Sequence, residues 1–441
     1  MRGMTSLSGT AERDYAAGER NEARLRRVAV ATMIGTAIEA FDFLAYGTAA
    51  ALVFNRYYFP AVDPAAGTLA AFGAFASGLF ARPIGGVIFG HFGDRIGRKT
   101  MLMLSLLLMG ASTVLIGVLP TYAQAGIWSP VLLVALRVVQ GLSFGGELAG
   151  AMLMAVEHAP CGRKSFFGSL PQGGAPFGLL LSTGAFALAN LLPDASFLAW
   201  GWRLPFLASS ILIVVGIFIR LRVEESPAFV GVKTARRVSA FPARQIILCR
   251  LPSLLLTFGG KLGEVTLYYT LVVFSLSFAV LQLGMARADV LRAIIIGAAF
   301  QIVTIPAFGW LGDWIGSKLL YALGGLLLAI TAVPLFMAIG SGSTSAFTAA
   351  VVVGLAVNYA CMFGPQSELY AAQFPPEIRY TGVSLGIQFA AAIGGGLAPI
   401  IATTLVAGFG SIVAVGFYLS ALGFLAAVCA ALMRDPAGEA A

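Results

Sequence analysis

Apolar runs of about 20 residues alternate with short polar breaks along nearly the whole chain. A run of that length crosses a bilayer as a helix, because backbone groups in lipid must bond within their own segment. The breaks at Pro, Gly and charged residues predict an all-α membrane protein with twelve transmembrane helices. Their expected ranges are 28–54, 67–91, 100–119, 129–158, 166–192, 202–223, 251–280, 289–312, 317–339, 344–373, 382–407 and 410–433.

A short polar hinge follows the second predicted helix and is repeated 219 positions later. The two copies are Gly90-His-Phe-Gly-Asp94-Arg95-Ile-Gly97-Arg98-Lys99 and Gly309-Trp-Leu-Gly-Asp313-Trp-Ile-Gly316-Ser-Lys318. Such an offset is too long for a solenoid repeat and indicates a duplicated domain. We therefore expect two pseudo-symmetric six-helix bundles, at 28–223 and 251–433. A cytoplasmic linker is expected at 224–250, with cytoplasmic tails at 1–27 and 434–441.

Composition supports a membrane protein, since 59% of residues are hydrophobic, 11% are charged and the mean hydropathy is +0.89. The net charge of +8 does not indicate a nucleic-acid partner, because about 21 of the 28 Lys and Arg fall on one predicted side of the bilayer. This asymmetry places both termini in the cytoplasm, and we expect a bacterial inner membrane. The four cysteines have no paired spacing, so no disulfide, metal site or cofactor is expected.

Two triplets of polar residues share the spacing i, i+3, i+7, which places each triplet on one stripe of its helix. They are Glu39, Asp42 and Tyr46 in the first helix, and Lys261, Glu264 and Tyr268 in the seventh. We expect them to face each other across a central cavity, where desolvation favours protonated carboxyl groups and would let an acid load and release a proton. The alternative is a permanent structural ion pair, such as Lys261 with a neighbouring acid.

The fourth helix carries Arg137, Gln140, Phe144 and Glu147 on one face. A guanidinium group keeps its charge and offers a planar fork that suits a carboxylate. Arg137 therefore either binds an anionic substrate or is the fixed partner of a buried acid. Gln172 and Gln388 lie at plausible membrane depth, either as ligand contacts or as helix-to-helix contacts.

The hinges suggest a gate. Asp94 and Asp313 lie near helix ends, where a carboxylate accepts bonds from a neighbouring helix N-terminus or pairs with Arg95, Arg98 or Arg163. Together with the hinge glycines Gly90, Gly97 and Gly309, such contacts would hold the cytoplasmic side closed. The alternative is that the hinges are only turns and topology anchors.

With these motifs in place, the chain resembles the major facilitator superfamily and, within it, the metabolite:proton symporter family. The resemblance covers about 28–433 and is carried by Ile38-Glu39-Ala-Phe-Asp42, Ala81-Arg82-Pro83, Gln140-Gly-Leu-Ser-Phe-Gly-Gly-Glu147, Trp202-Arg203-Leu-Pro205, Glu224-Glu225-Ser226-Pro227 and Arg379-Tyr-Thr-Gly382. It implies uptake of small metabolites with protons by alternating access. The sequence departs from the family pattern at Ala40, at Trp314 and at Gln366, where the family often has an acid.

The resulting hypothesis is a proton-coupled symporter for an organic acid, either shikimate-like or a di- or tricarboxylate. Glu39, Asp42 and Glu264 would couple protons, while Arg137 and Lys261 would hold a carboxylate. Tyr46, Gln140, Glu147, Tyr268, Gln172 and Gln388 complete the expected binding residues. The alternatives are a symporter for a zwitterion such as proline or betaine, a drug/proton antiporter, and a non-transporting sensor. No motif supports an enzyme, and we expect the protein to act as a monomer.

Overall fold

The computed structural model describes residues 33–60, 64–96, 98–145, 148–157, 159–160, 162–222, 246, 248, 250–375 and 378–436. The predicted tail 1–27 and nearly all of the predicted linker 224–250 lie outside these residues. The domain boundaries therefore stay predictions. Below, the first half denotes the described residues up to Arg222 and the second half those from Leu251 onward.

The regular elements of the first half are all helices in its described part, and short turns join them. They are the first helix (Met33–Tyr57), which contains the π-helical turn η1 (Ala50–Phe54) and ends in α2 (Asn55–Tyr57), then α3 (Pro64–Ile96), α4 (Arg98–Val118), α5 (Tyr122–Ala125), α6 (Trp128–Phe144), α7 (Leu148–Glu157), α8 (Lys164–Ser169), η2 (Pro171–Gly173), α9 (Gly174–Ala189), α10 (Asp194–Ala199), η3 (Gly201–Arg203) and α11 (Leu204–Arg222).

The second half is likewise helical. Its elements are α14 (Leu251–Tyr269), η4 (Thr270–Phe274), α15 (Ser275–Leu281), α16 (Arg287–Ile315), α17 (Ser317–Gly340), α18 (Thr344–Val353), η5 (Gly354–Tyr359), α19 (Ala360–Phe363), α20 (Gln366–Ala371), α21 (Arg379–Ala390), η6 (Ala391–Gly395), α22 (Gly396–Phe409) and α23 (Val413–Leu432).

Each of the twelve predicted segments coincides with one or more of these helices, which confirms the predicted all-α membrane fold. Nine helices among the described residues are long and apolar enough to cross a bilayer, and Met103–Val118 and Trp128–Phe144 are shorter apolar helices. Large apolar side chains such as Leu115, Ile211 and Val303 are exposed, whereas Asp42, Arg137 and Glu264 are buried. Apolar outside and charged inside is the arrangement that lipid requires.

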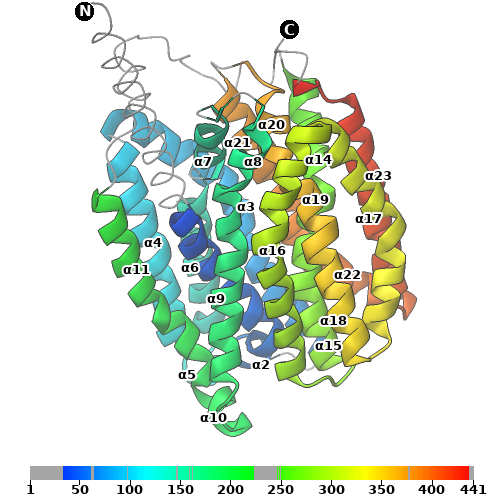
Figure 1. The fold of residues 1–441 in the computed structure, drawn as a ribbon. Helices are drawn as coiled ribbons and strands as arrows, with labels where there is room; N and C mark the ends of the chain where they lie inside the picture. Colours follow the sequence, from blue (N-terminus) through cyan, green and yellow to red (C-terminus); the bar gives the residue numbers. More distant parts are fainter. Residues whose placement is uncertain are drawn as a thin grey trace, which may run out of the picture.

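The helices of the two halves lie side by side (Figure 1). At one end of the molecule are α7, α8, α20 and α21, and we call this the α8 end. At the opposite end are α2, α5, α10 and α15, which we call the α10 end. Between the halves, α16 packs against α8 and α9, and α22 packs against α3.

Close packing of α3 on α6 depends on glycine. A Cβ added at Gly141 would lie 1.9 Å from the carbonyl oxygen of Gly78, and one added at Gly85 would lie 1.9 Å from that of Leu142. At Gly78 an added Cβ would also lie 2.8 Å from Nε of Arg137. Small residues at a helix contact let two backbones approach closely in lipid. These glycines bring α3 and α6 close enough for polar side chains of the two helices to lie together.

The first helices of the two halves each contain a π-helical turn, η1 and η4, and these turns are 220 positions apart. That spacing is close to the 219-residue offset of the hinges, so the turns occupy matching places in the repeat. The two turns contact each other where the halves meet. All residues of both turns are buried.

Candidate functional site

Two arginines lie against one aromatic ring between the helices of the first half. The guanidinium carbon of Arg82, on α3, lies 4.0 Å from the ring centroid of Phe43 and 3.7 Å from that of Phe144. The guanidinium carbon of Arg137, on α6, lies 3.8 Å from the Phe43 centroid. Such contacts stabilise a desolvated cation by roughly 2 kcal/mol. We call Arg82, Arg137 and the rings around them the arginine cluster.

Arg137 is fully buried, yet two of its nitrogens have no partner. Nη1 donates to Oε1 of Gln140 at 3.0 Å, whereas Nε and Nη2 have no hydrogen-bond partner among the described residues. The rings of Tyr46 and Phe75 lie 4.3 and 5.0 Å from its guanidinium carbon. A buried donor without a partner costs about 1–3 kcal/mol. The fork of Arg137 therefore suits an added acceptor such as a carboxylate.

The two predicted acids of the first helix lie beside this cluster. Glu39 is buried and interacts electrostatically with Arg82, which is also hydrogen-bonded to Tyr269 of the second half. Asp42 is fully buried, and its Oδ1 accepts a hydrogen bond from the Ser209 hydroxyl of α11. Its Oδ2 has no hydrogen-bond partner within the residues that the structure describes. The predicted stripe thus brings both carboxyl groups to the interior.

A polar path connects Arg137 with Asp42. Nε2 of Gln140 donates to the hydroxyl of Thr113 on α4 at 2.7 Å. The Thr113 hydroxyl donates to the carbonyl oxygen of Met109 at 3.0 Å, and it also lies close enough to interact with the Asp42 carboxyl group. Gln140 therefore contacts both the arginine and the hydroxyl next to the acid.

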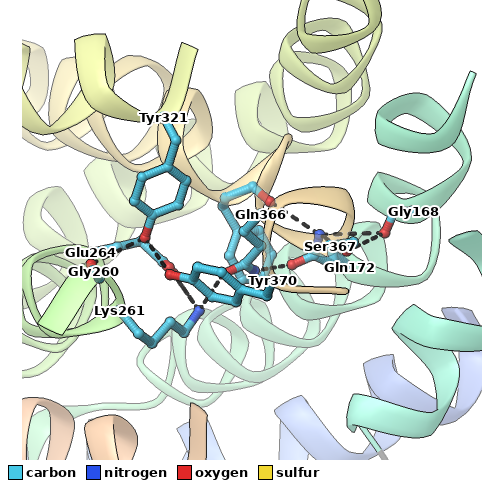
Figure 2. Close-up of polar contacts among 10 residues, drawn as sticks. Gly168, Gln172, Gly260, Lys261, Glu264, Tyr321, Gln366, Ser367 and Tyr370 are labelled. Atoms are coloured by element: carbon cyan, nitrogen blue, oxygen red, sulfur yellow. Dashed lines mark hydrogen bonds and ion pairs between the residues drawn. The ribbon is translucent and has the colours of Figure 1, made fainter. Parts of the chain in front are cut away.

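In the second half, Lys261 and Glu264 form a buried ion pair (Figure 2). Nζ of Lys261 donates to both carboxylate oxygens of Glu264, at 2.8 and 2.7 Å, and to Oε1 of Gln366 at 2.9 Å. Glu264 is also hydrogen-bonded to Tyr359. All three protons of the ammonium group are used. This is the salt-bridged arrangement that the sequence left open as an alternative.

Gln366 extends this pair into the first half (Figure 2). Its Nε2 donates to Oε1 of Gln172, and Nε2 of Gln172 donates to the carbonyl oxygen of Phe363 at 3.0 Å and to Oγ of Ser367 at 2.8 Å. Gln172 thus binds the second half, and its Nε2 also donates to the carbonyl oxygen of Gly168 in its own half at 3.3 Å. Its side chain is fully buried.

Further inter-half bonds lie at the α8 end. The Asp313 carboxylate accepts the backbone N–H groups of Ser165 at 2.8 Å and Phe166 at 3.1 Å, in the first turn of α8. The Ser165 hydroxyl donates to Oε2 of Glu368 at 2.6 Å. Nε2 of Gln388 donates to the carbonyl oxygen of Gly145 at 3.2 Å. The predicted contact of Asp313 with a neighbouring helix N-terminus is present, while its gating role stays a prediction.

The other predicted residues have varied surroundings. Tyr46 and Tyr268 are buried, and neither hydroxyl has a hydrogen-bond partner in the described ranges. Gly309 lies so close to α8 that an added Cβ would be 2.5 Å from Oγ of Ser169. Glu147 and Gly97 lie outside the described residues, as do the side chains of Asp94, Arg95 and Arg98, whereas the backbone of Gly90 belongs to α3.

Sequence reasoning did not single out Arg82, Thr113 or Ser209 as site residues. Arg82 carries a signal, because a charge inside a long apolar run is a functional candidate. Thr113 and Ser209 carry none, since hydroxyl residues are frequent in membrane helices and usually bond to their own backbone. Only the packing of α4 and α11 against the first helix places them beside Asp42.

Comparison with known proteins identifies the class. Residues 32–399 match the family model described as Major Facilitator Superfamily, so the chain belongs to this superfamily of membrane transporters, which are not enzymes. It is 39% identical over 416 residues to a shikimate transporter of Escherichia coli strain K12, covering 93% of this chain and 95% of that one. It is 40% identical to the inner membrane metabolite transport protein YhjE of the same strain, over 93% of this chain and 94% of that one. These matches confirm the resemblance stated above.

More distant matches are also transporters. A proline/betaine transporter of Escherichia coli strain K12 is 30% identical, over 95% of this chain and 85% of that one. Among solved structures, a D-xylose-proton symporter superimposes with a TM-score of 0.71 at 20% identity, over 93% of this chain and 98% of that chain. The structural match shows that the two chains share a fold.

Proposed function

We propose that the protein is a proton-coupled symporter that imports a small organic acid by alternating access. The observation that carries this proposal is the fully buried guanidinium group of Arg137, two of whose nitrogens have no hydrogen-bond partner in the described part of the chain. A cation in such a position attracts an anion, and the planar fork of arginine matches a carboxylate. The likeness to a shikimate transporter supports the same substrate class.

Protons would be taken up at the acids of the first helix. Protonation of Asp42 or Glu39 raises the net positive charge near Arg137 and so strengthens binding of an anion. By thermodynamic reciprocity, the bound anion strengthens proton binding by the same factor. The proton and the acid would therefore bind together, which is the requirement for symport.

The Lys261–Glu264 pair would respond in the same way. While Glu264 is ionised, it occupies Lys261 at 2.7 and 2.8 Å. Protonation of Glu264 would free the ammonium group for a substrate carboxylate. The hydrogen bond from Lys261 to Gln366, and that from Gln366 to Gln172, connect this event to a contact between the halves. Tyr268, which lies on α14 near this pair, would contact the bound substrate as well.

A second candidate is a symporter for a zwitterion. It is favoured by the proline/betaine relative and by the rings of Phe43, Tyr46 and Phe75 around Arg137. A betaine would place its carboxylate on the guanidinium fork and its ammonium group near a ring or an ionised acid. Both candidates need Arg137.

We place the protein in the bacterial inner membrane, with both termini in the cytoplasm and the α8 end facing that side. The positive-inside distribution of Lys and Arg supports this orientation. A monomer would be sufficient for transport. The Asp313 contact with α8 would then close the cytoplasmic side.

Transport in proteoliposomes tests the proposal. Full-length protein is reconstituted in vesicles that hold an internal pH dye, and shikimate, citrate, succinate, glycine betaine or proline is added outside. The expected result is acidification of the interior on adding one of the acids, absent from vesicles carrying Arg137→Gln and present with the exposed-surface variant Arg292→Gln. Acidification with betaine or proline alone would favour the zwitterion. No response to any of the five, with proton-driven movement of an apolar dye, would overturn symport in favour of export.

A further inference from the structure

A series of hydrogen-bond donors leads from Arg137 toward Asp42. Arg137 donates to Gln140 at 3.0 Å and Gln140 donates to Thr113 at 2.7 Å, while Thr113 lies beside the Asp42 carboxyl group. Arg137, Gln140, Thr113 and Asp42 are all at most 1% exposed. A cation and an acid thus lie at the two ends of one polar path through apolar surroundings.

The hydroxyl of Thr113 has one proton and two neighbouring acceptors. In this structure it donates to the carbonyl oxygen of Met109, and Asp42 accepts from Ser209 at Oδ1. Oδ2 of Asp42 has no hydrogen-bond partner among the residues described. That arrangement suits a protonated Asp42, because its own O–H is a donor and it does not require the Thr113 proton. An ionised Asp42 would attract the Thr113 proton, because hydrogen bonds to charged acceptors are about twice as strong as neutral ones.

We propose that Thr113 and Gln140 are positioning residues that couple the protonation of Asp42 to the availability of Arg137 for a substrate carboxylate. The inference rests on the proposed function above. With Asp42 ionised, donors run in one direction from Arg137 through Gln140 and Thr113 to the carboxylate, and each bond polarises the next. Arg137 is then held toward Gln140. When Asp42 takes a proton from water, Thr113 turns to Met109 and the hold on Arg137 weakens.

Other titratable groups lie near this path and belong to several elements. On the first helix they are Glu39 and Tyr46, on α3 Arg82, on α6 Arg137 and on α14 Tyr269. Glu39 interacts with Arg82, and Tyr46 lies against Arg137. The elements that contact Asp42 itself contribute hydroxyl groups, Ser209 from α11 and Thr113 from α4. The path through Thr113 is therefore separable from the Glu39–Arg82 interaction by mutation.

The test is the pH dependence of shikimate binding to full-length protein, measured by calorimetry between about pH 5.5 and 8.5. The carboxyl group of shikimate stays ionised throughout this range. Wild-type affinity is expected to rise as the pH falls, by at most about tenfold per unit for one linked proton. Thr113→Val, which keeps the side-chain shape and removes the hydroxyl, is expected to bind with less than about twofold change over the range. Thr113→Ser should restore the wild-type dependence of shikimate affinity on pH, which we call the pH slope.

Ser112→Ala is the matched control, because Ser112 is the neighbouring buried hydroxyl on α4 and donates to its own backbone at Leu108. Ser112→Ala should keep the wild-type pH slope of shikimate affinity. A wild-type slope in Thr113→Val would overturn the inference. Loss of the slope in Asp42→Asn together with its retention in Thr113→Val would leave the proposed function standing and remove only the role of Thr113.

An infrared titration tests the coupling between Asp42 and Arg137 without any bound substrate and without a folded Thr113→Val protein. The carbonyl stretch of protonated Asp42, assigned by its absence in Asp42→Asn, is followed against pH. Gln140→Leu removes a residue that bonds to Thr113 and Arg137, and we expect it to move the titration midpoint of Asp42. An unchanged midpoint in Gln140→Leu would overturn the coupling, whether or not shikimate is the substrate.

Discussion

Asp313 accepts the backbone N–H of Ser165 at 2.8 Å, although the two residues are 148 positions apart and belong to different halves. A carboxylate at the first turn of a helix meets unpaired N–H groups and the positive end of the helix dipole. One side chain of α16 therefore connects the two halves at the α8 end.

Asp313→Ala should loosen this connection. Loss of hydrogen bonds to a charged acceptor costs about 1.5–3 kcal/mol, so the opening equilibrium should rise about tenfold or more. Hydrogen–deuterium exchange of the peptide containing Ser165 and Phe166 is expected to accelerate accordingly. Asp289→Asn, at the other end of the same helix, is the control, since Asp289 forms an ion pair with the exposed Arg292 of its own helix at 3.4 Å. Equal exchange in both variants would contradict the assignment.

Arg137→Gln should abolish uptake of the acid while preserving the fold. Truncating a buried charge that binds a charged ligand costs roughly 2–5 kcal/mol, which is at least about thirtyfold in kcat/KM. The melting temperature should stay the same or rise, because the change removes two buried donors that have no partner. Uptake and thermal unfolding in detergent check both parts. A large fall in melting temperature would instead support the structural ion-pair reading.

The Lys261–Glu264 pair predicts non-additive mutants. Lys261→Met leaves a buried carboxylate without its cation, which costs about 3–5 kcal/mol. The double variant Lys261→Met/Glu264→Gln removes both charges and should recover most of the lost thermal stability. Neither variant should import the acid, if the pair takes part in transport. Thermal unfolding and uptake are measured for Lys261→Met, Glu264→Gln and the double variant, which together form a double-mutant cycle. Additive losses of stability would show that the pair contributes little.

Gly85→Ala should disturb the arginine cluster from a distance. An added Cβ would lie 1.9 Å from a backbone oxygen of α6, so α3 and α6 must separate, at about 1–3 kcal/mol. Uptake should fall together with the melting temperature. Gly73→Ala is the matched control on the same helix, since an added Cβ there has no neighbour within 4 Å. Unchanged uptake and melting temperature in Gly85→Ala would mean that the spacing of α3 and α6 does not position Arg82 and Arg137.

The fold could be predicted from sequence because two strong signals coincide. Bilayer thickness fixes the length of each apolar run, and the hinge repeat at Asp94 and Asp313 divides the helices into two groups. The spacing of Lys261 and Glu264, three residues apart, likewise anticipates their ion pair. These features depend on positions within one helix or on one repeat offset.

The composition of the site could not be predicted to the same degree. Asp42 was found as a buried acid, but its partner Ser209 lies 167 positions away. Which residues meet depends on the rotation and depth of each helix, and the glycines of α3 and α6 set these through packing. Arg82 could have been found from its position in an apolar run. Thr113 has no signal in the sequence, because its role depends on three helices meeting.

The π-helical turns η1 and η4 give the α10 end a different thermal response from the α8 end. The α8 end is joined by directional hydrogen bonds, whereas the contacting turns η1 and η4 consist of buried residues that are apolar apart from Thr270. The exposed ion pair of Arg287 with Asp194 also joins the two halves. Apolar contacts weaken on cooling, and exposing them to water raises the heat capacity. Cooling should therefore shift the protein toward opening at the α10 end, and warming should shift it back.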